Sequence, residues 1–184
     1  MDFEILYWMQ SNLRGTLPDA VMPVITFLGD YGLVWLLVGI ALICVKKYRR
    51  FGIECVAAVA LAGGIVNLLI KPLVDRLRPF MVDASVALLI DAPSSSSFPS
   101  GHTAASFAAM VVICSMPIKA YWKILAVLAA FLIAFSRMYL FVHFPSDVFM
   151  GMLLGLACGI VAVLLGNKFL APRMDSKTTK SLNE

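Results

Sequence analysis

Hydrophobic residues along this chain are gathered into long blocks that short polar stretches separate. The blocks predict helices at Tyr31–Val45, Ile53–Ile70, Thr103–Met116, Trp122–Val142 and Val148–Leu165. Several are shorter than the roughly 20 residues that a straight helix needs to cross the hydrocarbon layer, so we expect the helices to extend into the flanking polar motifs. Another apolar run, at 21–28, is either a short helix or the outer part of the first span, which makes the number of spans five or six.

The composition separates this chain from soluble proteins. Hydrophobic residues make up 61% and charged residues 14% of the chain, and the mean hydropathy is +0.90. Soluble domains are about half apolar and roughly a quarter charged, and a small soluble fold could not bury the excess. We therefore predict an all-α integral membrane bundle, with an N-terminal interfacial segment (1–30), a transmembrane domain (31–170) and a polar cytoplasmic tail (171–184).

The N-terminal residues lack the basic start and the small-residue cleavage site of a secretory signal. Residues 3–13 form either a short helix at the membrane interface, where Tyr7 and Trp8 suit headgroup depth, or a weakly ordered end.

Loop charges predict the orientation in the membrane. If the spans alternate, ten of the fifteen basic residues share one side, namely Lys46, Lys47, Arg49, Arg50, Lys119, Lys123, Lys168, Arg173, Lys177 and Lys180. Such residues accumulate on the cytoplasmic side, so we expect the segments 71–100 and 143–147 to lie outside. No basic patch is interleaved with exposed aromatic residues, so we predict no nucleic-acid partner.

Two outer segments combine residues that suit an anion. Lys71 and Arg78 offer a mobile point charge and a planar fork for an oxygen cluster, although the charges of this segment could also snorkel among lipid headgroups. In the second segment Ser100 is placed to cap a helix, Gly101 permits close backbone approach, and His102 follows. A helix N-terminus binds anions readily; the alternative is an ordinary capped helix with an incidental histidine.

A third outer segment contains Arg137, His143 and Asp147. A histidine four residues before a carboxylate can donate its Nδ1–H to that carboxylate and keep Nε2 free as a nucleophile or base. The alternative is an interfacial histidine beside a helix-capping aspartate, because Pro145-Ser146 is typical of a helix start.

Taken together, the three segments favour a phosphate pocket. The chain has only two histidines, and both lie in these segments. A charge such as that of Arg137 is costly in apolar surroundings unless it has a partner. We predict no metal and no other cofactor, because three cations beside two histidines and one carboxylate would repel a divalent ion.

In order and spacing, the three segments resemble the signature of the type 2 phosphatidic acid phosphatase family. That signature is a lysine, six residues and Arg-Pro; then Pro-Ser-Gly-His; then Ser-Arg, five residues, a histidine, three residues and an aspartate. Every position is matched here, by Lys71 with Arg78-Pro79, by Pro99-Ser100-Gly101-His102, and by Ser136-Arg137 with His143 and Asp147. The resemblance covers about residues 50–165.

The resemblance implies a mechanism. His143 would attack phosphorus to form a phosphohistidine, Asp147 would orient it, and His102 would protonate the leaving oxygen and then activate water. The residues that would hold the phosphate oxygens are Lys71, Arg78, Ser100, Gly101 and Arg137. The signature does not fix Asp75 or Arg76, and we assign these two residues no catalytic role.

The resemblance also suggests substrates. Short bacterial members of the family act on undecaprenyl diphosphate, phosphatidylglycerol phosphate or phosphatidic acid, and an outward-facing site in a bacterial plasma membrane favours the first. A lipid transporter or flippase, an inactive scaffold, and transfer of phosphate to an acceptor other than water remain as alternatives. The sequence does not indicate an oligomeric state.

Overall fold

The computed structural model describes residues 1–170, and all regular structure within that range is helical, as predicted. The longer helices are α1 (Asp2–Asn12), α2 (Thr16–Leu28), α3 (Leu33–Cys44), α4 (Arg49–Gly64), α7 (Gly101–Ser115), α8 (Ala120–Tyr139) and α9 (Pro145–Phe169). The short elements are η1 (Asp30–Gly32), η2 (Lys46–Tyr48), the π-helical η3 (Ile65–Ile70), α5 (Lys71–Val74) and α6 (Pro79–Val82). The predicted polar tail, 171–184, lies outside the described residues.

Each of the five predicted blocks corresponds to a helix or a run of consecutive helices, although the block at Trp122–Val142 continues past the end of α8 at Tyr139. By length and apolar composition, the stretch Lys46–Val82 and the helices α8 and α9 could each cross a membrane. The pair α2 and α3, bent by 46°, could form a fourth span, and α7 is a shorter apolar helix of 15 residues. Helices α8 and α9 reach 20 and 25 residues, and α9 does so by extending into its polar motif, as expected.

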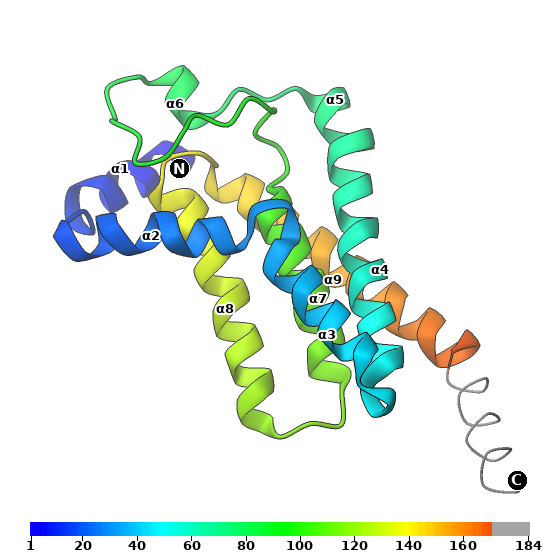
Figure 1. Cartoon of the computed structure of the whole chain (residues 1–184). Coiled ribbons are helices and arrows are strands. Elements are labelled where there is room, and N and C mark those ends of the chain that lie inside the picture. Colours follow the sequence, from blue (N-terminus) through cyan, green and yellow to red (C-terminus); the bar gives the residue numbers. More distant parts are fainter. Residues whose placement is uncertain (171–184) are drawn as a thin grey trace, which may run out of the picture.

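Helices α1 and α2 lie across one end of the bundle rather than along it (Figure 1). The bend after α2 means that α2 does not continue α3 in a straight line. The alternative of a weakly ordered N-terminus is wrong, because α1 is helical and buries Leu6 and Met9. Leu6 packs with Phe141 and Phe144 from the loop between α8 and α9. The N-terminal segment therefore touches the third of the three outer segments, which are called the first, second and third motifs below.

Close packing between α7 and α9 fixes the second motif against the third. A Cβ atom on Gly151 would lie 2.6 Å from the carbonyl oxygen of Ser100, and one on Gly159 would lie 2.7 Å from that of Ala108. Because glycines recur every fourth residue on α9, the two backbones approach as in small-residue contacts between membrane helices. This packing places the N-terminus of α7 beside the N-terminus of α9.

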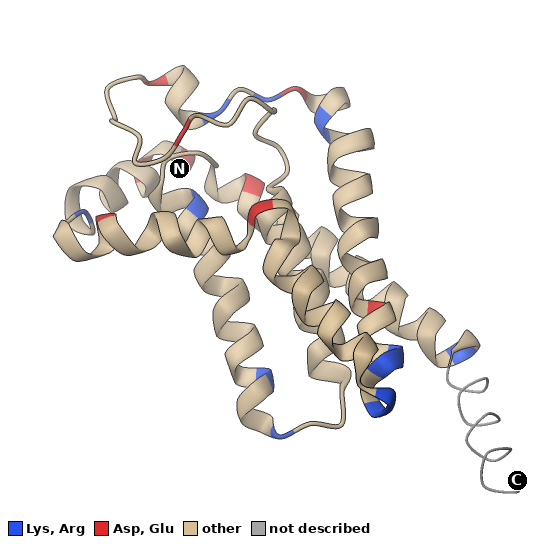
Figure 2. Ribbon diagram, in the orientation of Figure 1, with Lys and Arg blue, Asp and Glu red and all other residues tan. Residues whose placement is uncertain are grey.

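The charges divide the molecule into two ends (Figure 2). The basic residues before α4, at the start of α8 and at the end of α9 lie together at one end, and the three motifs lie at the other. The predicted alternation of the loops is therefore present in the described residues.

Candidate active site

A cavity of about 1160 Å³ opens at the motif end of the bundle. Six of the eight predicted site residues line it, namely Lys71, Arg78, Gly101, His102, Arg137 and His143. Ser100 and Asp147 are not among the lining residues and are fully buried behind it. Segments that are far apart in the sequence thus bring three cations and both histidines to one cavity.

Arg78 connects two loops at this cavity. Arg78 is only 2% exposed, and its guanidinium donates from Nε to the carbonyl oxygen of Ser95 at 2.7 Å and from Nη1 to that of Val142 at 2.8 Å. The same Nη1 lies 3.2 Å from Nε2 of His143. An arginine can only donate hydrogen bonds, so His143 Nε2 accepts here and carries no proton.

His143 lies in the short loop between α8 and α9, which turns through Phe141 at a φ of 61°. With Nε2 as the acceptor, the proton of the neutral ring is on Nδ1, which faces Asp147 Oδ2 at 3.6 Å. That distance is too long for a hydrogen bond, and Nδ1 has no other partner among the described residues. Burial, together with the charges of Arg137 and Arg78, holds the pKa of His143 well below its ordinary value. The ring is therefore neutral near pH 7, and the lone pair on Nε2 faces Nη1 of Arg78.

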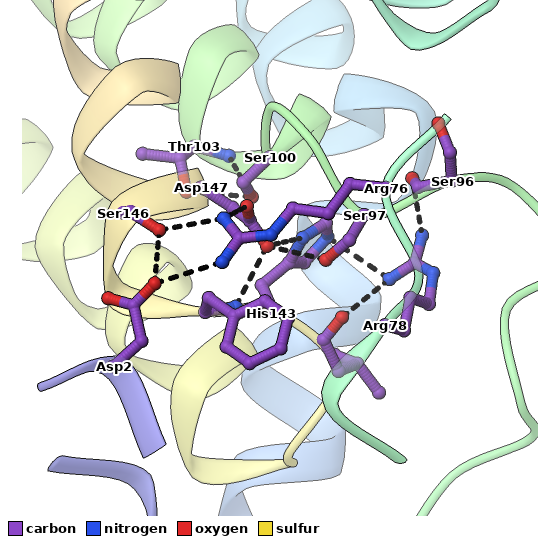
Figure 3. Close-up of polar contacts among 12 residues, drawn as sticks. Asp2, Arg76, Arg78, Ser96, Ser97, Ser100, Thr103, His143, Ser146 and Asp147 are labelled. Carbon is purple, nitrogen blue, oxygen red and sulfur yellow. Dashed lines mark hydrogen bonds and ion pairs between the residues drawn. The ribbon is translucent and has the colours of Figure 1, made fainter. Parts of the chain in front are cut away.

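Asp147 is held by a guanidinium, a hydroxyl and a backbone amide (Figure 3). Arg76 Nη1 donates to Oδ1 at 2.6 Å, while the Ser97 hydroxyl and the Phe144 amide donate to Oδ2. The bond from Phe144 closes the N-terminus of α9, so the capping role considered above is present as well. These contacts hold the carboxylate in place, with Oδ2 facing Nδ1 of His143.

Arg76 extends this network to the N-terminal helix (Figure 3). Its guanidinium lies 4.1 Å from the ring centroid of Phe144 and donates to Ser146 Oγ and, at 3.0 Å, to Asp2 Oδ2. Asp2 also accepts from Ser146. A residue to which the signature gives no role thus joins α1 to the carboxylate behind His143.

The second motif caps α7 as the sequence predicts. Ser100 Oγ accepts from the Thr103 amide and hydroxyl and is fully buried, so in this arrangement its hydroxyl is directed into the helix and not into the cavity. Gly101 has only Val66 near its missing Cβ, at 3.6 Å, which leaves its backbone open to an anion. Lys71 lies at the edge of the cavity and donates to Ser95 Oγ at 2.9 Å.

His102, in the first turn of α7, has a carboxylate partner that the motifs do not contain. Its Nε2 lies 2.7 Å from Oδ1 of Asp30 and 3.5 Å from Nη1 of Arg137. Arg137 donates to the Thr26 hydroxyl, and its buried Nε has no partner within the described part of the chain. An arginine N–H without a partner beside two histidines suits an anionic oxygen.

Sequence reasoning missed Arg76 and Asp30. The signal for Arg76 was its position two residues before Arg78, because alternate residues of an extended segment point to the same face. The signal for Asp30 was a carboxylate at the break between two apolar runs. Neither signal names a partner, since the contacts span 71 and 72 residues of sequence.

In residues 1–170 no group of three or more histidine, cysteine, aspartate or glutamate side chains could hold a metal ion. The ionisable side chains that line the cavity are instead three cations, two histidines, Tyr31 and the acidic residues Asp30 and Asp91.

Comparison with known proteins identifies relatives across most of the chain. The family model described as the PAP2 superfamily matches residues 52–170. An undecaprenyl-diphosphatase of Sulfolobus acidocaldarius is 37% identical over 134 residues, which cover 70% of this chain and 63% of that protein. A decaprenylphosphoryl-5-phosphoribose phosphatase of Mycobacterium tuberculosis is 33% identical over 139 residues, which cover 75% of each chain.

Solved structures agree with the sequence matches. The crystal structure of LpxE from Aquifex aeolicus superposes with a TM-score of 0.78 at 31% identity, covering 88% of this chain and 94% of that one. Other matched proteins are named for lipid A or for phosphatidylglycerolphosphate, so the headgroup differs among the relatives.

Proposed function

Because this chain belongs to the PAP2 superfamily of phosphatases, we propose that it hydrolyses a membrane lipid phosphate or diphosphate through a phosphohistidine intermediate. The observation that supports this proposal most is the protonation state of the His143 ring. Its unprotonated Nε2 lies at a cavity that also contains His102 and three cations. A neutral nucleophile, a second histidine and positive charge are what metal-free phosphoryl transfer requires.

In the first step His143 Nε2 attacks phosphorus, and the bond from phosphorus to the leaving oxygen breaks. His102 donates its proton to that oxygen. In the second step water attacks the phosphohistidine while His102 accepts a proton, and the phosphorus–nitrogen bond breaks to release inorganic phosphate. Asp147 faces the Nδ1–H side of His143, so it stabilises the positive charge that this ring gains during attack.

The cations of the cavity match the charge that develops. Lys71, Arg78 and Arg137 line one cavity and can each contact an equatorial oxygen of the transferred group, where negative charge spreads in the transition state. Ser100 would contribute through the helix N-terminus that it caps, and the backbone amide of Gly101, which lines the cavity, would donate to a phosphate oxygen.

The proposed substrate is undecaprenyl diphosphate, which would be hydrolysed to undecaprenyl phosphate. Two relatives are named for polyprenyl substrates. An apolar groove of about 820 Å³ follows α3 and α8. Ile133, which lines the groove, packs against Gly29, which lines the cavity, so the groove and the cavity are neighbours. A lipid tail in that groove would leave the phosphate end beside His143.

Phosphate release from the purified protein in detergent tests this proposal, with undecaprenyl diphosphate, phosphatidylglycerol phosphate and phosphatidic acid compared in the presence and absence of EDTA. We expect the highest rate on the first lipid and no loss with EDTA. A dominant rate on a glycerolipid would make the protein a phospholipid phosphatase, as the relative named for phosphatidylglycerolphosphate suggests. No release from any of the three would favour a transporter or an inactive scaffold.

The proposal also includes an orientation: a bacterial plasma membrane, with the site outside and the C-terminus in the cytoplasm. The clustering of basic residues at the far end of the bundle supports it. In a Cys44→Ser background we expect an impermeant thiol reagent to label Ser94→Cys in intact cells and to label Lys119→Cys only after lysis. Both positions are exposed; Ser94 lines the site cavity, whereas Lys119 precedes α8 at the far end of that helix, and the reverse pattern would contradict the orientation.

A further inference from the structure

The break between α2 and α3 has an unusual backbone. Tyr31 has a φ of 53° and Gly32 one of 70°, and a non-glycine residue in this region is costly unless the surroundings require it. The side chain of Tyr31 is 97% exposed, so packing of that side chain does not explain the turn. What the turn does is direct the preceding residue, Asp30, toward the N-terminus of α7.

The contact of Asp30 with His102 depends on close packing at the preceding residue, Gly29. A Cβ atom on Gly29 would lie 2.8 Å from Cδ2 of His102 and 2.7 Å from Ile133. A larger residue at 29 would therefore separate the two segments. With glycine there, Asp30 Oδ1 reaches Nε2 of His102 at 2.7 Å.

The geometry decides which nitrogen of His102 faces the substrate. A carboxylate only accepts hydrogen bonds, so Nε2 carries the proton, and the contact with Arg137 at 3.5 Å is too long to compete. Nδ1 has no hydrogen bond among the described residues and is not one of the buried unpaired atoms. It is therefore open to the cavity that His102 lines.

We propose that Asp30 is a positioning residue that holds His102 by Nε2 and presents Nδ1 to the leaving oxygen. The inference rests on the proposed function and adds a residue outside the signature to it. The other charged or titratable groups that face His102 are Arg137, Lys71 and His143. Two of these are cations that oppose a protonated ring, and the carboxylate of Asp30 is the one neighbour that favours it.

This arrangement serves both steps. The protonated ring donates Nδ1–H to the leaving oxygen as the phosphorus–oxygen bond breaks, while Nε2–H stays bound to Asp30. The neutral ring then accepts a proton from the attacking water on Nδ1 as the phosphorus–nitrogen bond breaks, which restores the starting state.

The test compares Asp30→Asn with Asp75→Asn. Asp75 is exposed on the same end of the molecule, makes no side-chain hydrogen bond within residues 1–170 and has a φ of 41°, which asparagine also adopts. Each variant is assayed on undecaprenyl diphosphate and on p-nitrophenyl phosphate, whose leaving group needs little protonation. Phosphohistidine is trapped by rapid quenching, and thermal unfolding in detergent checks folding.

We expect Asp30→Asn to lower turnover of the lipid by about 10- to 100-fold, by analogy with the range found for groups that orient a metal-bound histidine. Phosphohistidine should still form from p-nitrophenyl phosphate and should accumulate, because its hydrolysis needs the same histidine. The basic limb of the pH profile should move to lower pH. Asp30→Glu should recover part of the rate, and Asp75→Asn should match the parent protein.

Equal losses on both substrates without accumulation of phosphohistidine would overturn the inference and make Asp30 a structural residue. A gain in turnover would overturn it as well, because Asp30 would then occupy the place of the phosphate. The parent protein separates the two proposals: if it releases no phosphate, the proposed function and this inference both fail, whereas an active parent with an unaffected Asp30→Asn variant refutes the inference alone.

Discussion

Replacing His143 with alanine is expected to lower phosphate release by about 10⁴-fold or more, as happens when a nucleophile is removed from a covalent mechanism. Arg78 donates to the lone pair of His143 Nε2, whereas the other histidine of the cavity, His102, contacts Asp30 through its Nε2. The variant should fold, since the ring has an unpaired buried Nδ1 and contributes little polar stabilisation. Release of phosphate and quench trapping of phosphohistidine are the measurements.

His102→Ala is the matched comparison, because it removes the other histidine of the same cavity. We expect it also to stop turnover of the lipid, yet to allow phosphohistidine to form from an activated aryl phosphate. Near-normal turnover by His143→Ala would refute the mechanism. If phosphohistidine is trapped in His143→Ala but not in His102→Ala, the two roles are exchanged.

The membrane fold could be predicted from sequence because the hydrophobic blocks report burial in lipid directly. The block at 122–142 runs past the end of α8 at Tyr139, whereas the block at 148–165 begins after the start of α9 at Pro145. The positive φ of Phe141 ends the first helix at Tyr139, and Pro145 starts the next one. A short turn of this kind depends on backbone geometry, which hydropathy does not report.

The contacts within the site could be predicted only in part. The spacing of the motifs predicted that five residues converge, and the structure confirms that they line one cavity: Lys71, Arg78, His102, Arg137 and His143. It could not show that Arg76 rather than Arg78 pairs with Asp147, or that Asp30 contacts His102. The segment before α6 places Arg76 at Asp147, and the turn after α2 places Asp30 at His102. Both contacts join residues that are far apart in sequence, and no periodic pattern in the sequence indicates them.

For the second motif, the sequence predicted more contacts than the structure shows. Ser100 was expected both to cap α7 and to bind phosphate, and the structure has its hydroxyl in the cap. The hydroxyl can satisfy the helix N-terminus because Thr103 is placed to donate to it. Its predicted contact with phosphate stays a prediction, as do the catalytic roles of the other motif residues.

Asp147→Asn is expected to have the second largest effect, a loss of about 10³- to 10⁴-fold in kcat, by analogy with the aspartate that orients a catalytic histidine in a triad. The carboxylate is fully buried, so its charge acts on His143 with little screening. Asparagine can still accept the capping bond from the Phe144 amide. The variant therefore removes the charge and keeps the cap, which separates the two roles of this residue.

Arg76→Ala is the control that separates the charge of Asp147 from its ion pair with Arg76. It removes the guanidinium from Oδ1 but leaves Ser97 and Phe144 on Oδ2. Either change leaves one partner of the ion pair alone and should lower stability by about 1–3 kcal/mol, measured by thermal unfolding in detergent. If orientation of His143 depends on the charge of Asp147, Arg76→Ala retains much more activity than Asp147→Asn. Equal losses in kcat would mean that Asp147 contributes through the helix start and its ion pair, and the long contact of 3.6 Å to His143 would then carry no catalytic weight.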